Sequence, residues 1–105
     1  MVVTVPLYLD MLKGEQSLDS LRAFYQDFYA GERFVTVRPD DAPKCGFIGS
    51  NNLAGTNDLQ IFVCGNDEQV MLASRLDNLG KGASGAAVQN MNIMLGFDEA
   101  AGLAK

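Results

Sequence analysis

The sequence predicts a single α+β domain, built on an antiparallel or mixed β-sheet with helices packed on one face. Three observations lead to this prediction: strands are marked by alternating apolar residues, helices by apolar residues at three- and four-residue steps, and the coarse order is β-α-β-loop-β-β-α. The 105 residues suit one domain spanning 1–105. They are few for an enzyme that carries both a nucleotide domain and a substrate domain.

The first element is expected to be a strand over 2–9, "VVTVPLYL", which is rich in β-branched residues. Val3, Val5, Leu7 and Leu9 would share one face of it. Pro6 cannot donate a ladder hydrogen bond, so it indicates an edge strand or a bulge.

A helix is expected next, capped by Ser17 and ended by Gly31. Its apolar positions form an aromatic-rich stripe of Leu18, Leu21, Phe24, Tyr25, Phe28 and Tyr29. The stripe could be a ligand platform, but an amphipathic helix laid on a sheet produces the same pattern, and we prefer this core interpretation.

The middle of the chain is expected to hold a short strand at 33–39, then a long surface loop over 40–58 with room for one short strand at 45–49, "CGFIG". The segment "DLQIFVCGNDEQVMLASRL" alternates on both sides of "CGND", which predicts an antiparallel hairpin. Phe62 and Met71 make its second face apolar too, so both faces are expected to be covered.

The last helix is expected from Ala83 to Leu95, ended by Gly96. One face carries Ala83, Ala87, Met91, Met94 and Leu95, and the other carries Ala86, Gln89, Asn92 and Ile93. Because small residues and amides are unsuited to plain solvent, we expect this helix to be packed on both sides, one of them polar.

Before this helix, Gly80, Gly82 and Gly85 spell G-x-G-x-x-G. That spacing binds a dinucleotide only within a βαβ unit with an acidic residue beyond it. Here the preceding strand belongs to a hairpin, and "FDEAAGLAK" is too short for a second parallel strand. The sequence therefore argues against a Rossmann site in this chain, although exposed N–H groups beside Lys81 could hold an anion.

Composition excludes several function classes. The net charge is −5 with scattered cations, which argues against nucleic acid and anionic membranes as partners, and no apolar run approaches the roughly 20 residues of a membrane span. The N-terminus lacks the features of a secretory signal, so a cytoplasmic location is expected. Histidine is absent, and Cys45 and Cys64 form no C-x-x-C pair, so we expect no metal site and structural cysteines.

Three stretches, "GTNDLQIFV", "LDNLGKGASGAAVQNMNIMLG" and "DEAAGL", closely resemble the C-terminal part of N-acetyl-γ-glutamyl-phosphate reductase, most of all its shorter bacterial type. The stretch "DNLGKGA" is also similar to the corresponding part of the related aspartate-semialdehyde dehydrogenases. The resemblance is strong from about Gly55 to Leu103, moderate over "MVVTVPLYLDML", and weak between Gly14 and Ala54.

The resemblance implies a two-domain, NADP-dependent reductase of arginine biosynthesis and the semialdehyde dehydrogenase/glyceraldehyde-phosphate dehydrogenase-like fold for this chain. A Rossmann domain, absent here, would hold NADP and a nucleophilic cysteine. That cysteine takes the acyl group of N-acetyl-γ-glutamyl phosphate, and NADPH releases N-acetylglutamate semialdehyde. The family's cysteine and histidine lie upstream of the matched segment, so the resemblance implies no catalytic residue in this chain and an inactive isolated chain. Substrate contacts and a homo-oligomer interface are expected in it.

The resemblance also places "KGASGAAVQN" at the nicotinamide end of the cleft. Gln89 and Asn90 would offer amides to the cofactor, Gly82 and Ala83 would allow its close approach, and Lys81 would lie beside it. The alternative is that the amides only cap neighbouring backbone.

Thr56 and Asn57, at a strand start, could reach the substrate, although turn chemistry alone explains an asparagine there. A different class of function also stays open. The chain would then be a free-standing oligomerisation or ligand-binding module without catalysis.

Overall fold

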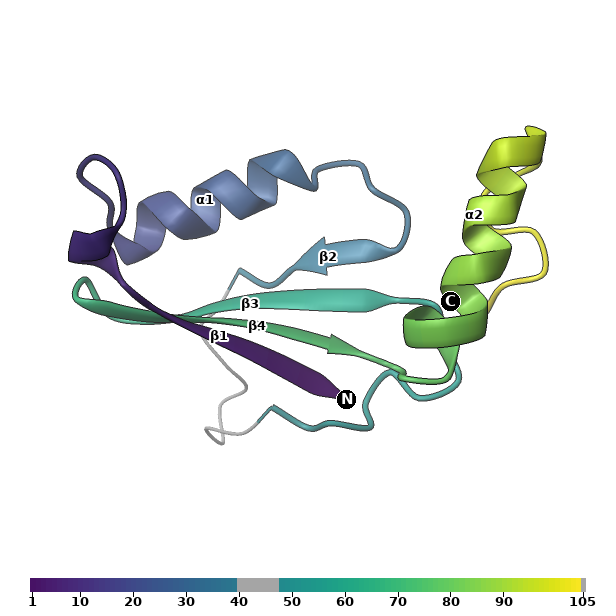
Figure 1. Cartoon of the computed structure of the whole chain (residues 1–105), viewed down its shortest axis with the longest axis horizontal. Coiled ribbons are helices and arrows are strands. Elements are labelled where there is room, and N and C mark those ends of the chain that lie inside the picture. The colour runs from purple at the N-terminus through teal and green to yellow at the C-terminus, as the bar shows by residue number, and fades with distance from the viewer. Residues whose placement is uncertain (40–47, 105) are drawn as a thin grey trace.

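The computed structural model describes residues 1–39 and 48–104. Its elements are β1 (Val2–Tyr8), a 3-10 turn (Leu9–Met11), α1 (Leu18–Phe28), β2 (Val35–Val37), β3 (Leu59–Gly65), β4 (Gln69–Leu76), a π-helical turn (Gly80–Ser84) and α2 (Gly85–Leu95). The strands form one sheet in the order β1-β4-β3-β2, with β2 parallel to β3 and the other pairs antiparallel (Figure 1). The predicted α+β class with a mixed sheet is confirmed. The possible strand at 45–49 lies mostly outside the described residues.

β1 is an edge strand, as Pro6 predicted. Met1 and Leu76 exchange backbone hydrogen bonds of 2.9 and 3.0 Å, and Leu9 N–H donates to Glu68 O at 3.0 Å. Because bonding alternates along an antiparallel pair, the odd-numbered residues of β1 are the ones that bond to β4. Pro6 is even-numbered, so its missing N–H costs the sheet no hydrogen bond.

The predicted hairpin is confirmed as β3 and β4, paired from Leu59↔Leu76 to Gly65↔Val70. Asn66 closes its turn, because its Oδ1 accepts from the N–H groups of Glu68 and Gln69, both at 2.9 Å.

Helix α1 begins at a reciprocal cap. Ser17 Oγ accepts from Ser20 N–H at 3.0 Å, while Ser20 Oγ accepts from Ser17 N–H at 2.8 Å. The helix lies on one face of the sheet, and its inner residues Leu18, Leu21 and Tyr25 pack against a core of Leu9, Val63 and Val70.

The core interpretation of the aromatic stripe is only partly right. Phe24 and Phe28 are 61% and 66% exposed, because they lie on the flank of α1 and not beneath it. Val3 and Val5, on the same face of the sheet as Leu72, are also about half exposed.

Residues 48–58 run below the sheet in Figure 1, on the face opposite α1. Phe62, Cys64 and Ala73 form a buried cluster there, with Val2 and Ile48 packed against it. Arg75 lies within 5.1 Å of the Phe62 ring centre and donates to Gly49 O at 3.2 Å. The second face of the hairpin is therefore covered at Phe62, but Met71 on the same face is 36% exposed, so the expectation that both faces are covered is only partly right. β1 is left open on the α1 side.

Helix α2 stands at the end of the sheet and not on its face (Figure 1). It ends at Gly96, whose φ of 73° is left-handed, as predicted. Only its polar side is packed, with Asn92 buried, whereas Met91, Met94 and Leu95 are exposed. The expectation that α2 is packed on both sides is thus wrong for the described chain, because no other described segment lies against its apolar side.

Candidate functional site

The candidate site lies where the start of β3, the π-helical turn, α2 and the C-terminal tail meet. Asp77 ties two of these segments together, since its Oδ2 accepts from Gly55 N–H at 2.8 Å and its Oδ1 from Leu79 N–H at 3.1 Å. These hydrogen bonds to the carboxylate lower the pKa of Asp77. The ionised side chain thus fixes the entry to the turn.

The G-x-G-x-x-G residues form the π-helical turn and the first residue of α2. Gly82 N–H donates to Asp77 O at 2.9 Å and Gly85 N–H donates to Gly80 O, bonds that span five residues and widen the turn. The preceding strand, β4, pairs antiparallel on both sides, so the motif follows a hairpin strand, as the sequence predicted.

Close packing explains two of these glycines. A Cβ on Gly80 would lie 2.6 Å from Thr56 O. A Cβ on Gly85 would lie 2.7 Å from Gly80 O and would overlap Asn57 Oδ1. The motif therefore brings the turn into contact with the start of β3.

Gln89 is the centre of a polar network. Its Oε1 accepts from Asn57 Nδ2 at 2.9 Å and from Lys81 Nζ, and its Nε2 donates to Glu99 Oε1 at 2.8 Å. A lysine can only donate and a carboxylate can only accept, so the two neighbours fix which way the Gln89 amide points. We call Asn57, Lys81, Gln89 and Glu99 the amide network.

The ammonium of Lys81 lies 5.6 Å from the centre of the Phe34 ring. Desolvation lowers the pKa of Lys81, and the carboxylates of Glu99 and Asp58 oppose that shift. The ammonium of Lys81 thus interacts with Gln89, Phe34 and nearby carboxylates of this chain. These surroundings are less favourable to a bound anion than the sequence indicated.

Asn57 is the most enclosed member of the network, at 2% exposure. Its backbone N–H donates to Ala104 O at 2.8 Å. Its Oδ1 is buried beside Gly85 and has no hydrogen-bond partner among the residues that the structure describes. Because Gln89 fixes the Asn57 amide, this oxygen cannot exchange places with the nitrogen.

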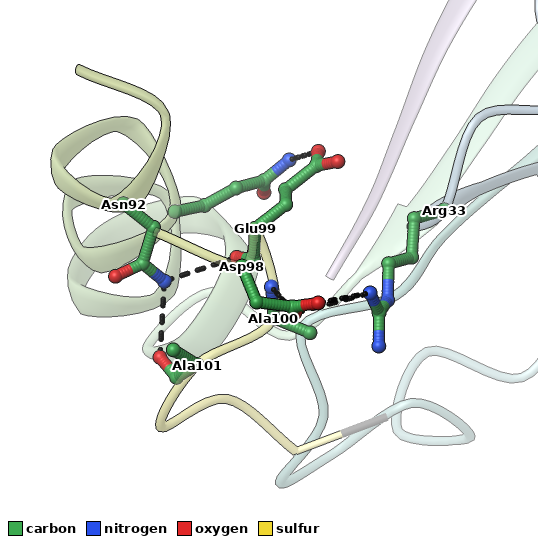
Figure 2. Close-up of polar contacts among 7 residues, drawn as sticks. Arg33, Asn92, Asp98, Glu99, Ala100 and Ala101 are labelled. Atoms are coloured by element: carbon green, nitrogen blue, oxygen red, sulfur yellow. Dashed lines mark hydrogen bonds and ion pairs between the residues drawn. The ribbon is translucent and has the colours of Figure 1, made fainter. Parts of the chain in front are cut away.

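The C-terminal tail fastens α2 to the end of the sheet (Figure 2). Asn92 Nδ2 donates to Glu99 O and Ala101 O, both at 3.0 Å, and Arg33 Nη1 lies 3.1 Å from Asp98 Oδ1. The sequence interpretation assigned no role to Arg33, Asp98 or Glu99. The stretch "DEAAGL" was the only signal for the tail, through its resemblance to the reductases.

The structure brings most of the predicted site residues to this one end. Lys81, Gln89 and Asn57 belong to the amide network, and Thr56 Oγ1 donates to Leu53 O at 2.8 Å beside them. A cleft of about 270 Å³ opens here, lined by residues 55–57, the turn and tail residues 102–104. The remaining cofactor candidates, Gly82, Ala83 and Asn90, are exposed and lie outside the network.

Two further features bear on the kind of site. The described residues contain no cluster of three or more histidine, cysteine, aspartate or glutamate side chains arranged to hold a metal ion. In the same part of the chain, no helix has the length and apolar character needed to cross a membrane.

The α+β sheet and α1 are matched by a known family. Residues 1–78 match the family described as semialdehyde dehydrogenase, dimerisation domain. This chain belongs to that family.

Known relatives extend the match through α2. The chain is 46% identical to N-acetyl-gamma-glutamyl-phosphate reductase 2 of Nostoc sp., over 98% of this chain and 34% of the relative. It is 48% identical to N-acetyl-gamma-glutamyl-phosphate reductase of Brucella ovis, over 91% of this chain and 32% of that protein. The matched region is the C-terminal part of these enzymes, so the chain spans about a third of their length.

Proposed function

We propose that this chain acts as the C-terminal domain of an N-acetyl-γ-glutamyl-phosphate reductase of arginine biosynthesis, in the cytoplasm and as a homo-oligomer. The observation that carries the proposal is the 46% identity to the Nostoc reductase over 98% of the chain. The nucleophilic cysteine, the histidine and most of the NADP site would come from a Rossmann domain outside these residues. No histidine occurs within them.

In this proposal α2 and the π-helical turn face the nicotinamide end of NADP, which supplies the hydride when it is bound. The exposed Asn90 amide can both donate to and accept from a carboxamide, and the small exposed residues Gly82 and Ala83 leave room beside it. These features fit a planar amide-bearing ligand. Gln89 already uses both ends of its amide within the chain, so its part is to position Lys81 and α2.

The substrate contacts are proposed at Thr56 and Asn57. Both line the cleft, and the unpaired oxygen of Asn57 would accept from a donor brought to this end by the substrate or by ordered water. Support comes from their position beside the cofactor candidates.

A chimera tests the function directly: this chain replaces the corresponding region of the Nostoc reductase. Phosphate-dependent reduction of NADP with N-acetylglutamate semialdehyde is then measured for the chimera and for the isolated chain. We expect turnover from the chimera alone, because the isolated chain has no histidine to move protons. A folded but inactive chimera contradicts the proposed function, and turnover by the isolated chain contradicts the placement of catalysis outside it.

A second candidate is a non-catalytic oligomerisation module. It is favoured by the family description, which names dimerisation and covers residues 1–78 without α2. The chimera separates the two, because a module that has lost its reductase contacts would fold and self-associate but would not restore turnover.

A further inference from the structure

The amide network has a direction, which depends on how the side-chain amide of Gln89 is turned. An amide that turns over exchanges the places of its donor and its acceptor. Glu99 Oε1 accepts from Gln89 Nε2 at 2.8 Å, and an ionised carboxylate can only accept. The Gln89 oxygen is therefore turned to the other side, where Lys81 Nζ and Asn57 Nδ2 donate to it.

Glu99 is the charged member of the network whose place is fixed by its backbone. Its carbonyl oxygen accepts from Asn92 Nδ2 at 3.0 Å, and Asn92 is buried in α2 (Figure 2). The preceding residue, Asp98, is joined to Arg33, with Oδ1 and Nη1 3.1 Å apart. Lys81, by contrast, reaches the network at the end of a flexible side chain. The anchored carboxylate therefore orients the amide, and the lysine adapts to it.

The charge of Glu99 also acts on Lys81. The Lys81 ammonium is half-buried, and it lies 5.6 Å from the centre of the Phe34 ring. Desolvation lowers the pKa of Lys81, and two carboxylates oppose that shift, Glu99 on the tail and Asp58 just before β3. Glu99 thus favours the charged lysine while it fixes the acceptor that holds it.

The position of Lys81 gives this arrangement a use. Lys81 directly precedes Gly82 and Ala83, the small exposed residues proposed to leave room for the nicotinamide end of the cofactor. An ammonium carries three N–H donors, and Gln89 engages one of them. Another donor can then meet an acceptor of a ligand that approaches over the two small residues.

We infer that Glu99 is a positioning residue, which acts through Gln89 to hold the Lys81 ammonium toward a hydrogen-bond acceptor of the cofactor. The inference rests on the proposed function for the ligand that Lys81 meets. The way in which Lys81 is held rests on the hydrogen bonds of the amide network alone.

An NMR titration of the lysine ε-carbons in the 105-residue chain tests the positioning step. Glu99→Gln keeps an acceptor for Gln89 Nε2 but removes the charge, so the pKa of Lys81 is expected to fall below its wild-type value. Asp98→Asn is the matched control, because it removes the neighbouring tail carboxylate, which pairs with Arg33, and it should leave the pKa of Lys81 unchanged. An unchanged pKa in Glu99→Gln overturns the inference, and so does an equal fall in the control.

Steady-state kinetics of the chimera with the Nostoc reductase tests the ligand step. Glu99→Ala leaves Gln89 Nε2 without its acceptor, so KM for NADP is expected to rise roughly tenfold with little change in kcat, as when a contact of the ground state and the transition state alike is lost. Glu99→Gln is expected to restore the wild-type KM at about pH 7, where lysine is ordinarily charged. As pH increases, its KM should rise earlier than that of the wild type, because Lys81 loses its proton at a lower pH. Asp98→Asn should leave KM unchanged.

The outcomes separate the inference from the proposed function. An unsubstituted chimera that folds without turnover contradicts the proposed function, and the Lys81 titration then decides the positioning step. In an active chimera, a wild-type KM in Glu99→Ala overturns the inference but leaves the function standing, and so does a Glu99→Gln variant whose KM matches that of Glu99→Ala. Thermal midpoints show whether each variant folds. If Glu99→Ala does not fold, a pH profile of KM in Glu99→Gln that is identical to that of the wild type overturns the inference.

Discussion

At the scale of single residues, the amide network accounts for the polar side of α2. Gln89 joins Asn57, Lys81 and Glu99, which come from the start of β3, the π-helical turn and the tail. Its amide is therefore a structural bridge in this chain, whatever else it contacts in a larger enzyme. The sequence placed Gln89 on a polar helix face but could not supply these partners, because Asn57 is 32 residues away and Lys81 and Glu99 lie outside α2.

Gln89→Leu is expected to lower the free energy of unfolding of the isolated chain by about 1–3 kcal/mol. The leucine keeps a similar volume but leaves the donors of Asn57 and Lys81 and the acceptor of Glu99 without their partner. Urea unfolding measures the change. Gln26→Leu is the matched control, because Gln26 is exposed on α1, and equal effects of the two substitutions would contradict the bridging role.

Asp77 makes a prediction about pH. The N–H groups of Gly55 and Leu79 lower its pKa in the folded chain below the ordinary value of 3.8. A carboxylate with a depressed folded pKa stabilises the fold above its unfolded pKa, and this stabilisation is lost as pH falls through the folded pKa. The difference in unfolding free energy between wild type and Asp77→Asn should therefore shrink as pH falls below about 3.8. A difference in unfolding free energy that does not change as the pH falls would contradict a stabilising role for the Asp77 charge.

At the scale of elements, the π-helical turn is the feature that sets the direction of α2. Its five-residue hydrogen bonds end at Gly85, whose backbone touches the Asn57 side chain. The turn thus joins β4, which ends at Leu76, to a helix that lies beyond the end of the sheet.

Gly85→Ala should destabilise the chain by roughly 1–3 kcal/mol, because the new methyl group meets the backbone at Gly80 and the buried Asn57 side chain. Gly82→Ala is the control within the same motif, since its Cβ would come no closer than 3.2 Å to a flexible Leu76 methyl group. Thermal melting of both variants measures the effect. If Gly82→Ala is the more damaging, the packing account of the motif fails.

Sequence patterns predicted the elements well where local chemistry decides them. The alternation in 58–76, the cap at Ser17 and the stop at Gly96 all lead to the observed hairpin, helix start and helix end. The π-helical turn was not predicted, because its form depends on contact with residues 56–57. Burial was also misjudged for Phe28 and Met94, since periodicity identifies an apolar face but does not show what covers it.

At the scale of the whole molecule, the chain has two parts. One is the sheet with α1, and the other is α2 with the π-helical turn and the tail, which we call the joint. The sheet and α1 fall within the matched dimerisation family, and the joint lies largely beyond it. The candidate site residues gather at the joint, where the start of β3 meets the π-helical turn and the tail.

The tail also has a consequence for how the chain is made. During synthesis the sheet residues leave the ribosome first, so β1, α1 and the hairpin can pair while the last residues are still being added. The amide network needs Glu99, and Asn57 N–H meets its acceptor only at Ala104. The candidate site is therefore the last part of this chain to be completed, and a nascent chain cut short before the tail would keep its sheet while α2 is left unfastened.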